Sequence, residues 1–152
     1  MTSTNEMSKK ILVTNALPYA NNSIHIGHLV GYIQADIWVR YQKMKERDCL
    51  YLCASDSHGT PIMLSAEAIG LEPEALAEQY TKEHSKDFQD FLIEFDNYHS
   101  THTTENETLV GEIFNQLNKS GHIEKKIIEQ SYDKKQEIFL PDRYVKGICP
   151  QC

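Results

Sequence analysis

The fold is decided by the stretch Pro18-Tyr19-Ala20-Asn21-Asn22-Ser23-Ile24-His25-Ile26-Gly27-His28, which lies between an apolar run, Ile11–Thr14, and a long amphipathic segment. This order predicts a strand, a tight turn and the start of a helix. His25 and His28 are three residues apart, so they share one face of the first helical turn. Free backbone N–H groups and the positive end of the helix dipole favour an anion there. The stretch therefore predicts either a phosphate site or a surface helix with two incidental histidines.

The composition is that of an ordinary globular chain of one domain, with 152 residues, 40% hydrophobic and 24% charged. A formal net charge of −7 argues against a protein that coats nucleic acid through a broad basic surface, although a local nucleic-acid contact remains compatible with it. The first ten residues lack the apolar core of a signal peptide, and no apolar stretch is long enough to span a membrane. Four cysteines without a disulfide-like framework predict a reduced, cytoplasmic chain with no membrane partner.

Two apolar runs flank the long helical segment. Lys10–Thr14 is rich in β-branched residues and does not alternate, which predicts a strand buried on both faces of a parallel sheet. Cys49–Ala54 is the second run, and it ends in the polar segment 55–59. Strand, helix and strand in this order predict a βαβ unit with parallel strands. Ligands bind at the carboxyl edge of such sheets, so we expect Pro18–His28 and Asp56–Gly59 to come together there.

A helix is predicted between the two strands, from about Gly27 to Lys45. We expect its apolar stripe to pack on the sheet, with Trp38 beside it: Leu29, Ile33, Ile37, Tyr41 and Met44. Downstream, Thr60 and Pro61 predict the N-cap and first residue of a helix that ends at Gly70. The next helix should begin at Pro73 and present an apolar face made by Leu76, Tyr80, Phe88, Leu92 and Phe95.

The remaining segments are shorter. Asp96–His102 predicts a brief third strand or a loop, and we expect its histidines to be structural rather than ligand-binding. Thr104–Glu107 has the pattern of a capping box and predicts the start of a helix on which Leu109, Ile113 and Leu117 lie in line. Beyond it, Ile123–Gln130 and Glu137–Leu140 are β-prone and predict a hairpin through Asp133–Gln136.

The longer sequence resembles a known family. His25-Ile26-Gly27-His28 is the HIGH sequence of class I aminoacyl-tRNA synthetases. Further motifs resemble methionyl-tRNA synthetases rather than their leucine, isoleucine or valine relatives: Ala16–Asn21, Gln34–Asp36, Trp38–Tyr41, Asp56, His58–Ile62, Asp96–His102 and Leu140–Arg143. The resemblance runs from Lys9 to Cys152 and corresponds to the N-terminal portion of the family. Asn22 stands where the family often has glycine, and asparagine tolerates the left-handed backbone that such a turn uses.

The resemblance implies an α/β fold and a two-step reaction. Residues 9–120 would form the N-terminal half of a Rossmann-like parallel-sheet nucleotide-binding domain, 1–8 a disordered tail, and 121–152 the start of a β-rich connective insertion. Methionine would attack the α-phosphorus of ATP, with Mg²⁺ as co-substrate, and the resulting methionyl-adenylate would transfer methionine to tRNA(Met). The enzyme supplies no nucleophile, so its residues position the substrates and stabilise charge on phosphoryl oxygens.

The resemblance also assigns roles to residues. His25 and His28 would be catalytic, donating hydrogen bonds to the phosphates. ATP would be bound by Tyr19, Asn21, His25, Gly27 and His28. Methionine would be bound by Leu17, Tyr19 and Asp56, with the Asp56 carboxylate on its ammonium group; from the residues alone, Asp56 could instead be a helix or turn cap. His58 would lie in the site without a defined role.

Cys149 and Cys152 form a Cys-x-x-Cys pair, the spacing of half a zinc knuckle. In the family, a second cysteine pair completes this Zn²⁺ site, so we expect weak zinc binding here or a need for another chain. A redox role is less well supported, because no thioredoxin-like context surrounds the pair.

These residues lack the family's lysine loop, so we expect the isolated 152-residue chain to be marginally stable and inactive or severely impaired. A further partner would be the family's remaining C-terminal portion, supplied as a separate chain. Two other readings stay open. One is a nucleotidyl-transferring relative that does not use tRNA. The other is a non-catalytic remnant that keeps a weak ATP or methionine site.

Overall fold

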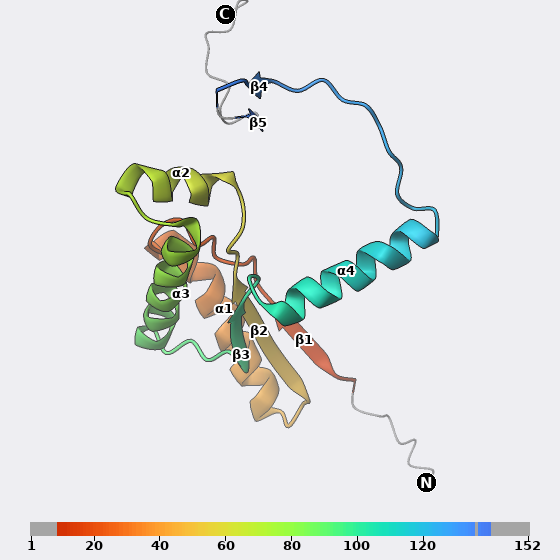
Figure 1. Cartoon of the computed structure of the whole chain (residues 1–152). Coiled ribbons are helices and arrows are strands. Elements are labelled where there is room, and N and C mark those ends of the chain that lie inside the picture. The colour runs from red at the N-terminus through yellow and green to blue at the C-terminus, as the bar shows by residue number, and fades with distance from the viewer. Residues whose placement is uncertain (1–8, 136, 141–152) are drawn as a thin grey trace, which may run out of the picture. The chain divides into compact units, whose positions relative to one another are not determined.

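The computed structural model describes residues 9–135 and 137–140 (Figure 1). The elements follow in the order β1 (Ile11–Thr14), α1 (Ile26–Met44), β2 (Cys49–Ser55), α2 (Thr60–Ile69), α3 (Pro73–Asp90), β3 (Asn97–Ser100), α4 (Thr104–Lys119), β4 (Tyr132–Asp133) and β5 (Ile138–Phe139). Internal contacts divide the chain into two compact units after Glu107, and each unit is described by itself. The expected tail at residues 1–8 and the pair Cys149 and Cys152 lie outside the described residues. The domain boundary near residue 120 stays a prediction.

The first unit is an α/β structure around a three-stranded parallel sheet. The strand order is β1-β2-β3, with Ile11 paired to Cys49 and Leu52 paired to Asn97. Figure 1 shows β2 between its two neighbours. The predicted βαβ unit is therefore confirmed. The segment that could have been a strand or a loop contains the strand β3.

The expectation that the first strand is buried on both faces was wrong. Leu12 of β1 is 63% exposed, and Thr14 is exposed as well. β1 has a hydrogen-bonded neighbour on one side only among the described strands. In β2, Cys49, Tyr51 and Cys53 are buried on one face, and they share one core cluster with residues of α1 and α3. Helices α1 and α3 thus cover the same face of the sheet.

The bounds of α1 agree with the prediction to within one residue, but its packing face was wrongly assigned. Leu29 of the predicted stripe is buried, whereas Ile37, Tyr41 and Met44 are 62%, 52% and 82% exposed. The helix instead buries the set Leu29, Tyr32, Asp36, Val39 and Gln42. Apolar periodicity missed this face because two of its members are polar residues that become buried only through specific partners.

One of those polar residues is Asp36, which ties α1 to the segment after α3. Its carboxylate accepts hydrogen bonds from Arg40 Nε at 2.5 Å and from the backbone N–H of Glu94 at 3.0 Å. Arg40 Nη2 also donates to the carbonyl of Leu92 at 2.6 Å. These contacts satisfy a carboxylate that would otherwise be costly to bury.

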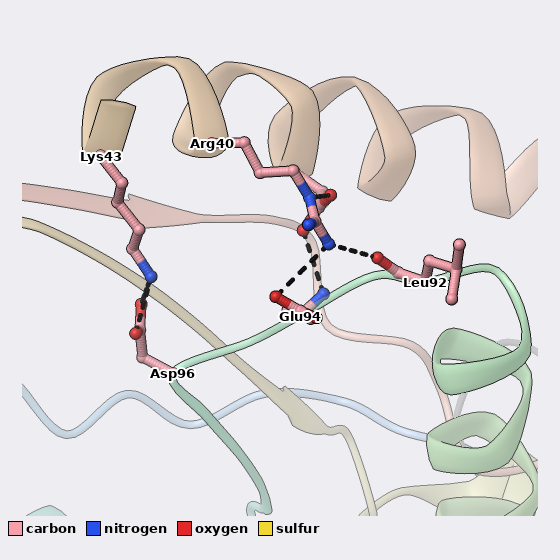
Figure 2. A network of polar contacts seen from close by, with 6 residues as sticks. Arg40, Lys43, Leu92, Glu94 and Asp96 are labelled. Carbon is pink, nitrogen blue, oxygen red and sulfur yellow. Dashed lines mark hydrogen bonds and ion pairs between the residues drawn. The ribbon is translucent and has the colours of Figure 1, made fainter. Parts of the chain in front are cut away.

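A second link joins the end of α1 to the start of β3, as Figure 2 shows. Lys43 Nζ lies 2.8 Å and 2.9 Å from the two carboxylate oxygens of Asp96. Asp96 also accepts the backbone N–H of Tyr51 at 2.7 Å. Its hydrogen bond with Lys43 is the main reason why the Asp96 pKa lies below its ordinary value. Helix α1 is thereby held against both β2 and the segment that leads into β3.

Two helix starts differ from the predictions by one residue. Thr60 is the first residue of α2 rather than its cap; the N-cap is Gly59, and Pro61 lies in the first turn. Thr103, not Thr104, caps α4, because its hydroxyl accepts the Asn106 N–H at 3.1 Å. The end of α2 at Gly70 is as expected, with a left-handed φ of 70°.

Helix α3 begins at Pro73 as predicted and ends earlier than its apolar pattern suggested. Leu76 and Phe88 are buried at 0% and 1% exposure. Leu92 and Phe95 come after the end of the helix, and Leu92 is 76% exposed. The helix stops because Leu92 adopts φ of 58° and Ile93 N–H bonds back to the carbonyl of Phe88.

The second unit contains the predicted hairpin in a shorter form. Tyr132 pairs with Phe139 and Asp133 with Ile138, antiparallel. The first strand is therefore at 132–133, and residues 123–130 have no strand, contrary to the prediction. Helix α4 buries none of its residues, so its apolar line at Leu109, Ile113 and Leu117 is exposed. Across residues 9–135 and 137–140, no helix combines the length and apolarity needed to cross a membrane.

Candidate functional site

The predicted turn and the end of β2 come together, as expected from the parallel strands. Tyr19 forms an isolated parallel bridge with Asp56. The Ala20 N–H donates to the Asp56 carbonyl at 2.9 Å, and the Asp56 N–H donates to the Pro18 carbonyl at 2.8 Å. The backbone thus fixes the two predicted polar clusters beside each other, which sequence spacing alone could only suggest.

Between β1 and this bridge, the segment that follows β1 has one residue more than the paired segment of β2. Residues 15–18 separate Thr14 from Tyr19, whereas 53–55 separate their partners Leu52 and Asp56. An extra residue of this kind re-aims the side chains that follow it. The side chain of Tyr19 therefore points to the opposite face of the sheet from the one that regular alternation along β1 would give it.

Two phenol groups hold the segment with the extra residue. Tyr51 Oη donates to Asn15 Oδ1 at 2.6 Å, and Tyr32 Oη donates to the Ala16 carbonyl at 2.6 Å. Both tyrosines are buried, and this burial raises the pKa of Tyr32 to about 12 and that of Tyr51 further. They remain neutral donors throughout the physiological range. Sequence reasoning missed them because a tyrosine in an apolar run looks like a packing residue.

His25 and His28 form a capping box at the start of α1. His25 is the N-cap, and its Nδ1 accepts the Gly27 N–H at 3.1 Å. His28 Nδ1 in turn accepts the His25 N–H at 3.4 Å. Because both Nδ1 atoms accept, the neutral rings carry their protons on Nε2. The two rings stack with centroids 3.7 Å apart, and both side chains are exposed.

The rings of His25 and His28 offer two Nε2–H donors to a ligand. The pKa of His28 is lowered by desolvation, then by the neighbouring charge of His25 and that of His84. A bound anion would reverse this effect, because it would stabilise the protonated ring. Together with the positive end of the helix dipole, the stacked rings are suited to hold phosphate oxygens.

Gly27 is required by the way His25 folds back on the helix. A Cβ added at Gly27 would lie 3.0 Å from His25 Cε1 and 3.1 Å from its Nδ1. A side chain at this position would therefore require the His25 ring to move by a few tenths of an ångström. The resemblance places Gly27 among the residues that would bind ATP. The structure adds a reason within the chain itself.

The side chains predicted to hold an amino acid lie around the bridge. Asp56 is half-buried and Leu17 is 40% exposed. The Tyr19 hydroxyl lies against Gly59, where an added Cβ would be 2.7 Å away, and Gly59 has φ of 123°. Asn21 follows directly, and its N–H donates to the Tyr19 carbonyl at 2.9 Å. Tyr19 thus links the turn to the segment 56–59 through both its backbone and its ring.

His58 has partners beside this cluster. Its Nε2 lies 3.0 Å from His102 Nδ1, and His102 Nε2 lies 3.5 Å from a Glu74 carboxylate oxygen. These three residues line a pocket of about 290 Å³ with Ile62 and Ala77, among others. The ring of His102 thus contacts His58 and Glu74, and its structural role stays a prediction.

The described residues supply no obvious metal site. In the ranges 9–135 and 137–140, no group of three or more histidine, cysteine or acidic side chains could hold a metal ion. Cys49 and Cys53 are buried free thiols, and burial raises the pKa of Cys53 to about 11. Such a thiol is a poor nucleophile and metal ligand at neutral pH. The predicted zinc half-site falls outside the described residues.

Comparisons with known proteins point to one family. The family model described as tRNA synthetases class I (M) matches residues 11–152. The chain is 56% identical over 144 residues to methionine–tRNA ligases of two Francisella tularensis strains, OSU18 of subspecies holarctica and WY96-3418 of subspecies tularensis. The match covers 95% of this chain and 21% of each relative, so the chain spans about a fifth of their length.

Solved structures share the fold. Mycobacterium tuberculosis methionyl-tRNA synthetase in complex with methionyl-adenylate matches with a TM-score of 0.78 at 24% identity, over 92% of this chain and 28% of that one. A leucyl-tRNA synthetase from Agrobacterium radiobacter K84, in a ternary complex, matches with a TM-score of 0.77 at 21% identity. That match covers 90% of this chain and 18% of the other. At these identities, the likeness concerns the fold alone.

Proposed function

We propose that this chain, which belongs to the class I methionyl-tRNA synthetases, forms the part of their catalytic domain that activates methionine with ATP. Methionine's carboxylate attacks the α-phosphorus of ATP, pyrophosphate leaves, and methionyl-adenylate forms. The terminal ribose of tRNA(Met) then takes the methionyl group. The substrates supply both nucleophiles, so the chain's residues act by positioning and by stabilising charge.

The observation that carries this proposal is the stacked pair His25 and His28 at the start of α1. Each ring accepts a backbone N–H at Nδ1, which leaves Nε2–H to donate. Crowding at the α-phosphorus increases negative charge on the phosphoryl oxygens, and donors fixed beforehand stabilise that charge without reorganisation. Tyr19, Asn21 and Gly27 complete the proposed ATP site.

The proposed methionine site lies next to the phosphate site. Asp56 is held by the bridge to Tyr19, where its carboxylate can pair with the substrate's ammonium group. Leu17 and the Tyr19 ring supply apolar and aromatic surface, which suits a thioether. This juxtaposition would place the methionine carboxylate between its ammonium partner and the phosphates held by the histidines.

Other components of the reaction follow from the family and are part of the proposal. ATP would arrive with Mg²⁺ as co-substrate, and tRNA(Met) would be the acceptor in a cytoplasmic setting. Cys149 and Cys152 would contribute half of a Zn²⁺ site. We further propose that the 152 residues alone bind substrates weakly and turn over little, because relatives use about five times this length. A non-catalytic remnant with a weak ATP or methionine site is the competing reading.

Calorimetry and pyrophosphate exchange test the proposal. We expect the chain to bind ATP, and His25→Ala combined with His28→Ala to weaken binding roughly tenfold or more, since two charge-assisted hydrogen bonds are lost. His122→Ala, which removes an exposed histidine of the second unit, is the matched control and should have no effect. Methionine binding should respond to Asp56→Asn but not to the histidine changes.

The outcomes separate the readings. Methionine-dependent exchange between ATP and pyrophosphate, lost in the double histidine variant, would establish the enzyme. Binding without exchange would leave the remnant reading for this chain. ATP binding that is indifferent to His25 and His28 would refute the proposed site.

A further inference from the structure

One buried histidine outside the predicted site contacts the anion-binding turn, which we define as residues 19–28. His84 lies on α3 and is 1% exposed. Its Nε2 is 2.7 Å from the carbonyl oxygen of Asn22, which lies 62 residues earlier in the chain. A carbonyl oxygen only accepts, so Nε2 carries the proton and donates. This hydrogen bond joins helix α3 to the anion-binding turn.

Packing alone does not explain a histidine at this position. Nδ1 of His84 is buried and has no hydrogen-bond partner among the described residues. An unpaired buried ring nitrogen is unfavourable, and an apolar side chain of similar size would avoid it. The hydrogen bond to Asn22 is therefore the feature of this side chain that an apolar residue could not supply.

The turn has little else to hold its centre. The hydrogen bonds of residues 21–23 are otherwise local, from Asn21 N–H to the Tyr19 carbonyl and from Ser23 N–H to Asn22 Oδ1. Among the described residues, the bond from His84 joins this part of the turn to another element. Asn22 is three residues before the N-cap His25, so a shift at Asn22 moves the start of α1.

We propose that His84 is a positioning residue, which fixes the Asn22 carbonyl and thereby sets His25 and His28 for phosphate binding. This inference rests on the proposed function for its consequence, but the contact itself can be tested without any substrate. His84 touches no reacting atom in this arrangement. It acts through the backbone of the turn.

An electrostatic observation supports the proposal. His84 is one of the groups whose charge lowers the pKa of His28, after desolvation and His25. The two side chains are therefore near enough to influence each other. Removing the imidazole should shift the titration of the His28 ring, which a change in packing at a remote site would not do.

Three variants of the full 152-residue chain test the proposal. His84→Gln keeps an N–H donor near the position of Nε2, and His84→Leu fills the space without a donor. Phe88→Leu is the control for packing, because Phe88 is one turn further along α3, is 1% exposed and belongs to the core beside β2. Each variant is studied by urea unfolding, by NMR of the backbone amides of 22–28 with a pH titration of His28, and by calorimetry with ATP.

We expect His84→Leu to move the amide resonances of the turn, to shift the His28 titration upward and to weaken ATP binding roughly fivefold to tenfold, the effect of one lost hydrogen bond. His84→Gln should restore the turn's amide resonances and most of the ATP affinity. Phe88→Leu should lower stability and leave the turn, the His28 titration and the ATP affinity as in the parent chain.

The inference is overturned if His84→Leu resembles Phe88→Leu, with lower stability and an unchanged turn, or if His84→Gln fails to restore the amide resonances of the turn and the ATP affinity that His84→Leu loses. If the parent chain binds no ATP while the NMR changes occur as expected, the contact is established and the proposed function fails. The two failures are thus distinguishable.

Discussion

At the scale of single residues, Gly27 shows how tightly the turn and helix are fitted. A Cβ added at Gly27 would lie 3.0 Å from the His25 ring. We expect Gly27→Ala to displace His25 from the Gly27 N–H and to weaken ATP binding roughly tenfold. Stability should change by less than about 1 kcal/mol, because the ring is exposed and alanine favours the helix. Calorimetry and urea unfolding measure the two effects separately.

Gly31→Ala is the matched control for that prediction. Gly31 lies one turn further along α1, and an added Cβ there would have its nearest neighbour at 3.7 Å, an ordinary contact. It should keep ATP affinity unchanged. Equal losses in both variants would mean that contact with the His25 ring does not explain the effect.

Leu92 is a residue in a conformation that suits glycine. It occupies the first position after the C-cap of α3 with φ of 58°, and its side chain is 76% exposed. A left-handed backbone costs a bulky residue about 1 to 2 kcal/mol. We expect Leu92→Gly to raise the free energy of unfolding by about 0.5 kcal/mol, the gain being reduced by the freer unfolded chain. Urea unfolding measures it.

Leu92→Ala serves as the comparison, because alanine keeps the strain and removes the exposed side chain. It should give no gain in stability. If both variants are stabilised equally, the benefit comes from losing an exposed apolar group and the backbone explanation is wrong.

The residues in and around the proposed site divide into those that the sequence could reveal and those that it could not. His25, His28 and Asp56 belong to motifs near the ends of strands, so local pattern and resemblance found them. Tyr32, Tyr51 and His84 support the turn through side-chain contacts across the fold. Such contacts depend on which faces meet, and a linear pattern does not carry that information.

At the scale of elements, α1 is held by polar links as well as by packing. The buried carboxylate of Asp36 accepts from Arg40 and from the Glu94 N–H. We expect Asp36→Ala to lower the free energy of unfolding by about 2 to 3 kcal/mol, since a charged acceptor is lost and a backbone N–H is left unpaired. Asp36→Asn should lose less, because its amide oxygen still accepts. Thermal or urea unfolding decides between them.

An exposed neighbour provides the control for this element. Glu94 is 3.5 Å from Arg40 Nη2, and its side chain is 77% exposed. Glu94→Gln should change stability by less than about 0.5 kcal/mol, as exposed ion pairs usually do. A loss as large as that of Asp36→Ala would show that charge on the surface, not the buried carboxylate, holds the helix.

The link between Lys43 and Asp96 should give stability that depends on pH. The Asp96 pKa is lowered mainly by its hydrogen bond with Lys43, so the folded chain holds the proton less tightly than the unfolded chain. The contribution of this link to the free energy of unfolding is therefore complete above pH 3.8, the ordinary pKa of the carboxyl group. It is lost as the pH falls through the lower pKa that Asp96 has in the folded chain. We expect Asp96→Asn to be less stable by roughly 0.5 to 1 kcal/mol at pH 7, and the difference to shrink below about pH 4.

Urea unfolding of both proteins from pH 7 to pH 3 measures this difference. Asp96→Asn keeps an acceptor for the Tyr51 N–H, so the comparison isolates the charge. A difference that is constant across the range would contradict the assignment of the effect to Asp96 ionisation.

Element positions were easier to predict than element faces. The bounds of β1, α1, β2 and α2 and the start of α3 followed from apolar runs and from Gly70 and Pro73, within one or two residues. The buried face of α1 did not, because Asp36 and Gln42 replace apolar residues on it and are satisfied by partners such as Arg40 and Arg47. The third strand was ambiguous because Asn97–Ser100 is short and polar.

At the scale of the molecule, the sheet of the first unit has an exposed edge. β1 carries the apolar side chain Leu12 at 63% exposure and pairs only with β2 among the described strands. Exposed edges of this kind favour association between copies. We expect Leu12→Lys to reduce self-association of the 152-residue chain, measured by sedimentation velocity over a range of concentrations. Leu12→Val keeps an apolar edge and should associate as the parent chain does; a monomeric parent chain would contradict the prediction.

The parallel sheet and the hydrogen bond from His84 to Asn22 also affect when the turn can assemble during translation. The partners Asn22 and His84 are 62 residues apart, and ribosomes add about 5 to 20 residues per second, so roughly 3 to 12 s separate their synthesis. During that interval, the turn has been made but its partner has not. The bridge to Asp56 must likewise wait for β2 to emerge. The histidine turn is thus translated early and fixed late, and its assembly is paced by elongation rather than by local folding.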